Sequence, residues 1–374
     1  MNLMRRGSTP LLLIGTATAA LLAAGCSASG ESPGSTAGSP SSADVRSTDG
    51  AASSADFPVV IQHALGETVI EEQPMRVAAV AWGDHEVPLA LGVVPVGMSA
   101  AAWGDDDGDG VLPWVEERLD DLDAETPVLF DETDGIDIEA VAATEPDVIL
   151  AAYSGLTQEE YDTLSRIAPV VAYPEVAWGT SMEDMIRLDS QALGLDAEGE
   201  ALIAELDEEI AEEVADRPAL LGTDVLVGYI DPTDLSQIGY YTTHDTRPGF
   251  LESIGMGVPQ TVSDFSAGSD AFYTTISAER ADQLDDVDLM VVYGQTDGST
   301  LRELQADPLL GQIPAIRDGA VAVLQDSTPL AAAANPSPLS VDAMLEDYLD
   351  VLDAAIAAGG QGGSALSGTA SPDA

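Results

Sequence analysis

The sequence predicts an α/β protein with two lobes joined by one long helix. From Phe57 onward, short apolar runs rich in β-branched residues alternate with segments of helical periodicity, and the alternation starts again after Pro218. Near-continuous apolar strands separated by helices are typical of sheets covered on both faces. Between the two alternating regions lies one long, mostly acidic segment of helical periodicity, 198–215. These three observations predict two lobes and a connecting helix.

The first lobe is predicted to span 56–195. Its apolar runs place Val, Ile, Ala and Leu side by side, as in strands buried on both faces. We expect strands at 76–82, 93–96, 147–150 and 170–172, and helices at 86–91, 138–143 and 158–167.

The connecting helix is predicted to span 196–217. Leu202, Leu206, Ile210 and Val214 recur every four residues, and Glu and Asp fill most other positions. A helix with one narrow apolar stripe is expected where it bridges two domains across solvent. The alternative is a peripheral amphipathic helix on one lobe. We favour the bridge because complete α/β alternations lie on both sides.

The second lobe is predicted to span 218–358 and repeats the pattern of the first. We expect strands at 225–230, 289–293 and 320–324, and helices at 250–254, 278–284 and 341–357. No repeat at the period of a solenoid or propeller is visible.

Both ends of the chain have their own character. The first residues predict a signal peptide at 1–25, because two arginines are followed by an apolar run and then by Ala23-Ala24-Gly25-Cys26. The last four of these residues are similar to a bacterial lipobox, in which Cys26 would carry the lipid. An ordinary signal peptide is the alternative. A Ser/Gly/Pro tract at 26–55 predicts a disordered tether, and 359–374 a disordered tail. We expect an exported protein on the outer face of the cell membrane, attached through the lipid only.

Charge narrows the possible partners. The net charge is −54, from 66 acidic and 12 basic residues, and every basic residue is arginine. Such a surface repels nucleic acid and anionic lipid headgroups, and it favours a monomer. The three histidines lie far apart without a nucleophile elbow, and there is no phosphate-binding P-loop. We therefore expect neither an enzyme nor a required cofactor.

Five segments together resemble the substrate-binding proteins of bacterial iron-siderophore ABC importers. They are 76–97 (RVAAVAWGDHEVPLALGVVPVG), 139–150 (EAVAATEPDVIL), 152–174 (AYSGLTQEEYDTLSRIAPVVAYP), 245–255 (DTRPGFLESIG) and 335–345 (NPSPLSVDAML). The resemblance implies two Rossmann-like lobes joined by one long helix, with a ferric siderophore in the cleft between them. It also implies delivery of the siderophore to a membrane permease and its ATPase.

Four aromatic residues are predicted to line such a cleft. A ferric siderophore supplies its own iron ligands, so the protein needs flat apolar walls and a few donors. Trp82 ends the first strand of the body and Trp103 follows the second, and Tyr153 and Tyr293 each follow a later strand. They therefore lie at the carboxyl edge of a sheet, where α/β clefts open. The alternative for each is ordinary packing.

Arg247 is the predicted donor. The resemblance implies that an arginine at this place points into the cleft, where its guanidinium can bind the iron-bound oxygens of the siderophore. A salt bridge at the start of a helix is the alternative. Tyr240 and Tyr241 could add hydroxyl donors, but a strand alternates faces, so only one of them should face the cleft.

The charge also suggests the ligand class. A tri-anionic catecholate complex would be repelled, whereas a neutral or cationic hydroxamate complex, such as a ferrioxamine, would not. The open alternatives are a binder of haem, cobalamin or a bare metal ion, and a surface lipoprotein without a transport role. A bare-metal site would need several convergent ligands, and His85 is the only histidine well placed for the cleft.

Two further groups of acidic residues have predicted roles. The resemblance implies that Glu139 and Glu279, one in each lobe, contact arginines of the permease; the alternative is a first-turn glutamate favoured by the helix dipole. Asp105, Asp107, Asp109 and Glu116 have the spacing of an EF-hand calcium loop. The alternative there is a solvated acidic loop.

We predict that salt stabilises this protein, because screening weakens the repulsion among its carboxylates. Thermal melts should shift upward by several degrees between low and molar NaCl, as suits a salty habitat. A midpoint that stays level over this range would contradict the prediction.

Overall fold

The computed structural model describes residues 57–367, with side chains as far as residue 360. All of them belong to one compact unit. The predicted signal peptide, the tether with Cys26, and residues 368–374 lie outside the described residues. Within 57–367, no helix has the length and apolar character needed to cross a membrane.

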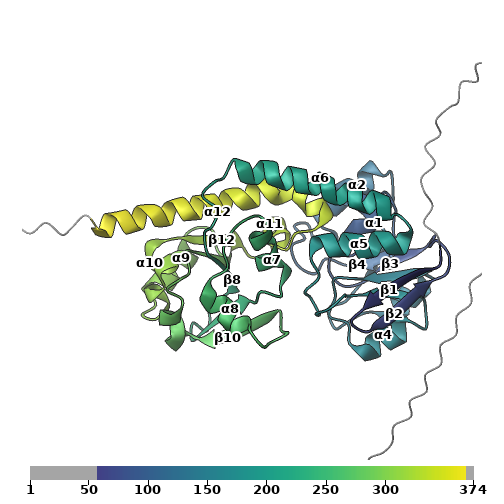
Figure 1. Ribbon diagram of the computed structural model, residues 1–374, viewed down its shortest axis with the longest axis horizontal. Helices are drawn as coiled ribbons and strands as arrows, with labels where there is room; N and C mark the ends of the chain where they lie inside the picture. Colours follow the sequence, from purple (N-terminus) through teal and green to yellow (C-terminus); the bar gives the residue numbers. More distant parts are fainter. Residues whose placement is uncertain (1–56, 368–374) are drawn as a thin grey trace, which may run out of the picture. The chain divides into compact units, whose positions relative to one another are not determined.

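The N-terminal lobe contains a parallel sheet with strand order β5-β4-β3-β6-β7 (Figure 1). Its strands are β3 (Val77–Ala79), β4 (Gly97–Ser99), β5 (Val128–Phe130), β6 (Val148–Ala151) and β7 (Val170–Ala172). Its helices are α1 (Glu86–Ala90), α2 (Pro113–Asp121), α3 (Ile138–Ala143), α4 (Gln158–Leu164) and α5 (Met182–Leu193). A hairpin of β1 (Val59–His63) and β2 (Gly66–Ile70), which the pattern did not predict, precedes this sheet.

The alternation of side chains along β6 shows how this sheet is covered. Val148 and Leu150 pack in one core with α5, and Ile149 and Ala151 pack in another with α3 and α4. All four are fully buried. The prediction of a sheet covered on both faces is therefore confirmed.

The C-terminal lobe contains a mixed sheet with order β10-β9-β8-β11-β12. Its strands are β8 (Val225–Tyr229), β9 (Gln237–Tyr241), β10 (Tyr273–Ser277), β11 (Leu289–Gly294) and β12 (Val321–Gln325). Its helices are α7 (Thr246–Ser253), α8 (Gln260–Ser266), η1 (Ala278–Gln283), α9 (Ser299–Ala306), η2 (Leu310–Gln312), α10 (Pro314–Asp318) and α11 (Pro329–Ala333). β8, β11 and β12 are parallel, and β9 and β10 form an antiparallel edge.

The acidic periodic segment forms α6 (Asp196–Ala215), which connects the lobes (Figure 1). It packs against α5 of the N-terminal lobe and against α12. Leu206 and Val214 of the predicted stripe are buried, and Leu202 and Ile210 pack partly buried against the same core. The prediction of a long connecting helix is confirmed.

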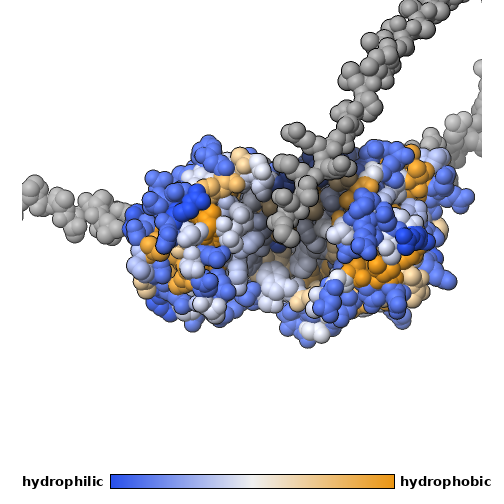
Figure 2. Space-filling view, turned by 90° about the horizontal axis from the view of Figure 1, so that it is seen from below, coloured by the Kyte–Doolittle hydropathy of each residue, from blue (hydrophilic) through white to orange (hydrophobic). Residues whose placement is uncertain are grey.

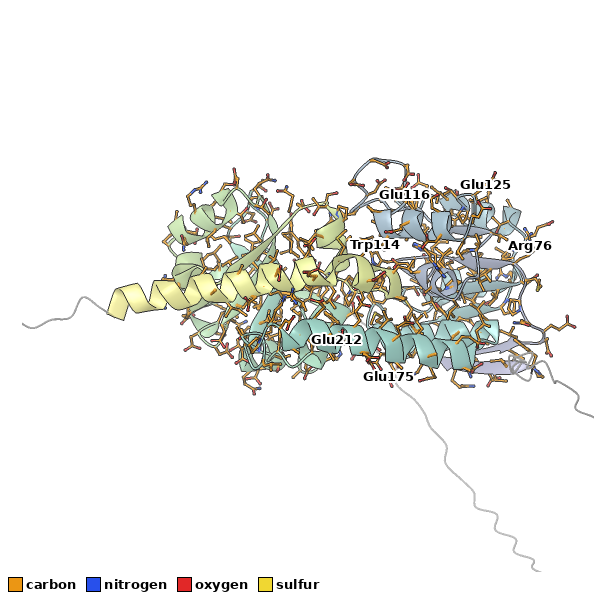
Figure 3. All side chains as sticks on the ribbon, turned by 90° about the horizontal axis from the view of Figure 1, so that it is seen from above. Arg76, Trp114, Glu116, Glu125, Glu175 and Glu212 are labelled. Carbon is orange, nitrogen blue, oxygen red and sulfur yellow. The ribbon has the colours of Figure 1, made fainter. Side chains whose placement is uncertain are left out.

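A second helix, α12 (Pro338–Ser367), also contacts both lobes. It packs on α1 and α2 of the N-terminal lobe and on β12 and α10 of the C-terminal lobe. Figures 1 and 3 show it beside α6. It continues to Ser367, past the boundary at 358 that the pattern predicted, so the chain is still helical where the disordered tail was expected to begin.

The strand predicted at 93–96 is wrong, because the strand is β4 (Gly97–Ser99). Val93 N donates to Pro88 O at 2.7 Å in the turn after α1, and Val94 is 37% exposed. The strand needs Gly97, since a Cβ there would lie 2.3 Å from Cζ of Phe130. The apolar run 93–96 thus precedes the strand and is not part of it.

Glu86 holds the start of α12 on the N-terminal lobe. Its Oε2 accepts a hydrogen bond from the Ser337 hydroxyl and another from Leu339 N at 3.3 Å. An acceptor at the first turn satisfies helix N–H groups that have no partner within the helix. Glu86 is fully buried, and burial raises its pKa to about 7, although the hydrogen bond from Ser337 acts in the opposite direction.

We predict that Glu86→Gln makes the protein less sensitive to alkaline pH. In the folded state the pKa of Glu86 is raised to about 7, so above that pH the charged carboxylate destabilises the fold. As the pH falls toward the ordinary pKa of a glutamate in the unfolded chain, the folded protein binds a proton at Glu86 and the destabilisation disappears. Gln keeps an acceptor for Ser337 without the charge. Between pH 5 and 8, the free energy of unfolding should fall by roughly 2–3 kcal/mol more in the wild type than in the variant.

Urea unfolding at the two pH values measures this difference. Other buried carboxyls act in both proteins and cancel in the comparison. Glu139→Gln, at an exposed position, is the control and should behave as the wild type. Equal pH dependence in Glu86→Gln and wild type would contradict the prediction.

Candidate functional site

Two groups of aromatic side chains face each other where the lobes meet. Trp103 of the N-terminal lobe and Tyr293 of the C-terminal lobe have ring centroids 5.6 Å apart. Trp178 and Phe272 form a second pair across the lobes, at 6.4 Å. Viewed from the side opposite α6, the surface is hollowed between the lobes (Figure 2). The aromatic groups are extended by Trp82 beside Trp103, Tyr153 beside Trp178, and Tyr241 beside Tyr273.

The loop after β3 positions Trp82. Ala81 and Gly83 on either side of it have φ values of 63° and 78°, so the chain turns sharply there. Ala81 N donates to Glu132 Oε2 at 2.9 Å. Asp84 Oδ1 accepts from Tyr153 N at 3.0 Å, which joins this loop to the loop after β6. Two side-chain carboxyl groups therefore hold the backbone that presents Trp82 and Tyr153.

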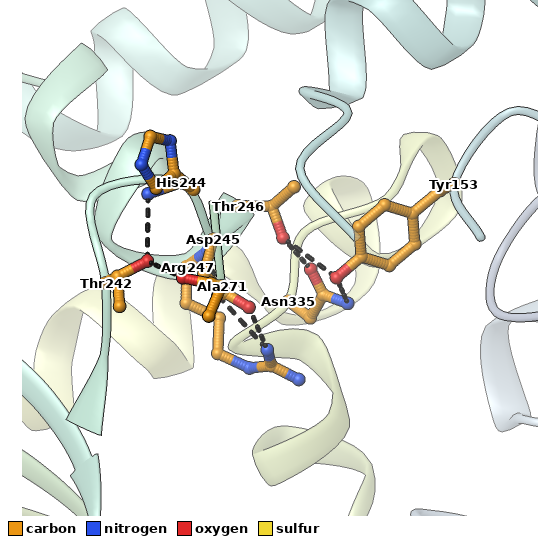
Figure 4. A network of polar contacts seen from close by, with 8 residues as sticks. All are labelled: Tyr153, Thr242, His244, Asp245, Thr246, Arg247, Ala271 and Asn335. Carbon is orange, nitrogen blue, oxygen red and sulfur yellow. Dashed lines mark hydrogen bonds and ion pairs between the residues drawn. The ribbon is translucent and has the colours of Figure 1, made fainter. Parts of the chain in front are cut away.

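A ring of hydrogen bonds joins the lobes at Tyr153 (Figure 4). Asn335 Nδ2 donates to the Tyr153 hydroxyl at 3.1 Å, and the hydroxyls of Tyr153 and Thr246 lie 3.3 Å apart. Thr246 Oγ1 donates to Asn335 Oδ1. Each hydroxyl has a single proton, so the ring closes when Tyr153 donates to Thr246. Every polar group of the ring then has a partner.

Arg247 lies in the first turn of α7, in an ion pair with Asp245 (Figure 4). Its Nη1 lies 3.1 and 3.0 Å from the two carboxylate oxygens, and Asp245 Oδ1 also accepts from Arg247 N. The guanidinium carbon is 4.2 Å from the centroid of the Tyr241 ring. Burial disfavours the charged form, but Asp245 and the nearby tyrosines hold the pKa of Arg247 above its ordinary value.

The sequence allows Arg247 to be either a donor in the cleft or part of a salt bridge at the start of a helix, and the geometry is compatible with both. The helix-start salt bridge is present, and the side chain is 16% exposed. Among the described residues, nothing accepts a hydrogen bond from its buried Nε. The guanidinium is therefore charged, held in place by Asp245, and has donor capacity left. Because Asp245 neutralises it, the pair adds no net positive charge to the cleft.

The structure separates the two adjacent tyrosines. Tyr241 lies beside Arg247, whereas Tyr240 is 1% exposed and packs against Phe265 in the core of the C-terminal lobe. Burial raises the pKa of Tyr240 to about 12. Tyr240 therefore lies on the face of β9 that points into the core, and Tyr241 is the one of the two that lies beside Arg247.

Sequence reasoning missed four residues of this region, namely Trp178, Thr246, Phe272 and Asn335. Asn335 and Thr246 fall inside segments that carried the family resemblance, so their amide and hydroxyl were visible signals. Trp178 and Phe272 lie in loops outside those segments, where nothing in the sequence relates one to the other. His85 is buried. Burial lowers its pKa to about 4.

A separate groove of about 570 Å³ lies between α6, α7 and the start of α5. It is lined by apolar residues such as Ile210, Val214 and Phe250, and it reaches His244 and Thr246. Its lining includes neither Arg247 nor any of the predicted aromatic residues. The groove is therefore an alternative ligand site to the aromatic cleft, the hollow between the lobes beside Trp103 and Tyr293. Unlike that cleft, it has no guanidinium that could bind an iron-bound oxygen.

Glu139 and Glu279 are exposed in the first turns of α3 and η1. Each lobe thus presents one of them, as both the permease interpretation and the helix-dipole interpretation require.

The acidic loop brings three of its four predicted ligands together. Single oxygens of Asp105, Asp107 and Asp109 lie within 4.8 Å of one another. Both carboxylate oxygens of Asp105 already accept backbone hydrogen bonds, for instance from Gly110 N at 2.7 Å. Glu116 lies in the first turn of α2 (Figure 3). Calcium binding and a solvated loop both stay open predictions.

Comparison with known proteins gives a consistent result. The family model described as "Periplasmic binding protein" matches residues 77–328. PiaA of Streptococcus pneumoniae TIGR4, solved in complex with ferrichrome, is 45% identical, with 80% of this chain and 99% of that chain covered and a TM-score of 0.77. A periplasmic solute binding protein of Mycobacterium smegmatis str. MC2 155 is 27% identical, with coverage of 80% and 98% and a TM-score of 0.62. The putative ABC transporter substrate-binding lipoprotein YhfQ of Bacillus subtilis (strain 168) is 24% identical, with coverage of 74% and 83%.

We predict that Tyr153→Phe destabilises the protein. The change opens the hydrogen-bond ring and leaves the buried Asn335 amide without its acceptor, which should lower the free energy of unfolding by about 1–3 kcal/mol. Urea unfolding measures it. Tyr229→Phe, at a ring that is 41% exposed, is the matched control and should change stability by less than about 0.5 kcal/mol. Equal stability of the two variants would show that the ring contributes nothing.

Proposed function

The chain belongs to the periplasmic binding protein family, and from this premise we propose that it captures a ferric siderophore and delivers it to an ABC permease. The observation that carries the proposal is the pair of aromatic walls from opposite lobes, with the ion-paired Arg247 beside them. Aromatic faces suit a bulky, pre-formed iron complex, and one guanidinium suits its iron-bound oxygens. The identity to PiaA supports iron uptake as the process.

We propose a hydroxamate siderophore as the ligand. Arg247 is the only arginine among the residues that build the aromatic walls, and Asp245 already neutralises it. A tri-anionic complex would therefore enter a cleft without spare positive charge, in a protein whose net charge is −54. A neutral or cationic complex meets no such penalty. The ferrichrome complex of PiaA supports this class.

Delivery requires contact with the membrane component. We propose that Glu139 and Glu279 meet arginines of the permease, one from each lobe, and that Cys26 carries the lipid that keeps the protein at the membrane. Both glutamates are exposed. Haem, cobalamin and a bare metal ion are competing ligands that the binding experiment below includes.

We predict that ferric hydroxamates, tested as ferrichrome and ferrioxamine, quench tryptophan fluorescence saturably at sub-micromolar concentration. Arg247→Lys should weaken binding roughly 10-fold or more, because Lys keeps the ion pair with Asp245 but loses the planar fork, and a hydrogen bond to a charged group contributes about 1.5–3 kcal/mol. A ferric catecholate should bind more weakly than either hydroxamate.

Two matched controls locate the site. Arg280→Lys makes the same chemical change at an arginine that stacks on Phe265, and it should leave affinity unchanged. Ala211→Tyr fills the groove beside α6, and it too should leave affinity unchanged. If Ala211→Tyr alone loses binding, the siderophore binds in the groove and not in the aromatic cleft. If haem, cobalamin or a metal ion binds and the siderophores do not, the proposed siderophore ligand is wrong.

A further inference from the structure

A side pocket of about 170 Å³ opens in the C-terminal lobe at the carboxyl ends of β8 and β11. It begins where the aromatic cleft ends, because Tyr293 belongs to both. The Trp103 ring meets Tyr293 edge to face, and Trp103 Nε1 donates to Asp326 Oδ1 at 3.3 Å, so two of the residues that Trp103 contacts line the pocket. A ligand against Trp103 would therefore have the pocket mouth beside it.

The lining combines an apolar wall with negative charge. Ile230, Leu235 and Val292 give the pocket an aliphatic side. Asp326 and Glu303 are its only charged residues, and both are exposed to solvent on one side. Within the described part of the chain, neither forms an ion pair with an arginine. Trp103 uses one oxygen of Asp326.

A buried polar atom stands at the boundary between cleft and pocket. Tyr293 is 7% exposed, and its hydroxyl has no hydrogen-bond partner of normal geometry among residues 57–360. Burial raises the pKa of Tyr293 to about 12, so the hydroxyl stays protonated. Arg247 and Tyr241 act on this pKa, so the hydroxyl lies on the cleft side of the boundary and is available to a group of the ligand in the aromatic cleft, next to the pocket mouth.

We propose that this pocket receives a cationic side arm of the siderophore, a primary ammonium at the end of a short aliphatic chain. The methylene groups would pack on the Ile230 side, and the ammonium would lie between Asp326 and Glu303. The inference rests on the proposed function and narrows it from hydroxamates in general to those with a positively charged substituent. A carboxylate discriminates a charged donor from its neutral analogue, because the charge-assisted hydrogen bond is shorter and stronger.

The test compares two probes with the same ferric core, ferrioxamine B with its free ammonium and its N-acetyl derivative without the charge. Tryptophan quenching of the full chain at low ionic strength should show roughly 10-fold tighter binding of the ammonium form, in line with a charge-assisted hydrogen bond. The Asp326→Asn, Glu303→Gln double variant should bind both forms within about twofold of each other and the acetylated form as the wild type does. The change Asp326→Asn keeps a side-chain oxygen that can accept from Trp103.

A second double variant separates the pocket from the general acidity of the surface. Asp285→Asn with Glu252→Gln removes the same charge from exposed positions of the same lobe, outside the pocket, and should keep the wild-type preference. Equal binding of the two probes by the wild type would overturn the inference and leave the siderophore function standing. An equal loss of preference in both double variants would overturn it as well, since the surface would then be the cause. If neither probe binds, the proposed function fails first.

Discussion

The hydroxyl of Tyr153 is the contact on which the arrangement of the lobes depends. It is buried, and its partners Thr246 and Asn335 come from the other lobe. Separating the lobes would leave the Tyr153 hydroxyl and the Asn335 amide nitrogen without their partners, and water would have to enter between apolar walls to replace them. Glu86 imposes a similar condition on α12. The same arrangement brings the aromatic rings of the two lobes into contact, with Trp103 and Tyr293 edge to face.

The ion pair of Arg247 and Asp245 sets the chemistry of the cleft in the same way. An unpaired guanidinium in this place would attract anions, whereas a paired one orients donors without adding net charge. In the function we propose, the cleft therefore recognises shape, aromatic contact and hydrogen-bond acceptors. Negative charge on a ligand gains little there, and positive charge meets the carboxylates of Asp326 and Glu303 nearby. The lining and the acidic surface favour the same kind of ligand.

Local periodicity was sufficient to predict much of the fold, and tertiary contacts explain the rest. The helix at 138–143 and the strand at 170–172 have the predicted bounds, because their patterns are uninterrupted. β4 was misplaced because its glycine accommodates the ring of Phe130, which lies on another strand. For the site, the strand-end aromatics followed from their position at a sheet edge, whereas Arg247 followed from the family resemblance alone. Trp178 and Phe272 are far apart in the sequence and come into contact only in the folded protein, so no local sequence pattern could predict the pair.

The arginines show how so acidic a chain uses its few cations. Arg118 donates to the carbonyl oxygens of Leu89 and Ala90 at the end of α1, and Arg217 ties Glu213 on α6 to Asp350 on α12. Each satisfies several acceptors at a junction, which one fork of donors can do and a lysine ammonium does less well. Arginines committed to such junctions are not available to a ligand. Among the described residues that build the aromatic walls, Arg247 is the only cation and Asp245 already pairs with it, so in the function we propose an anionic iron complex would find no unpaired cation in the cleft.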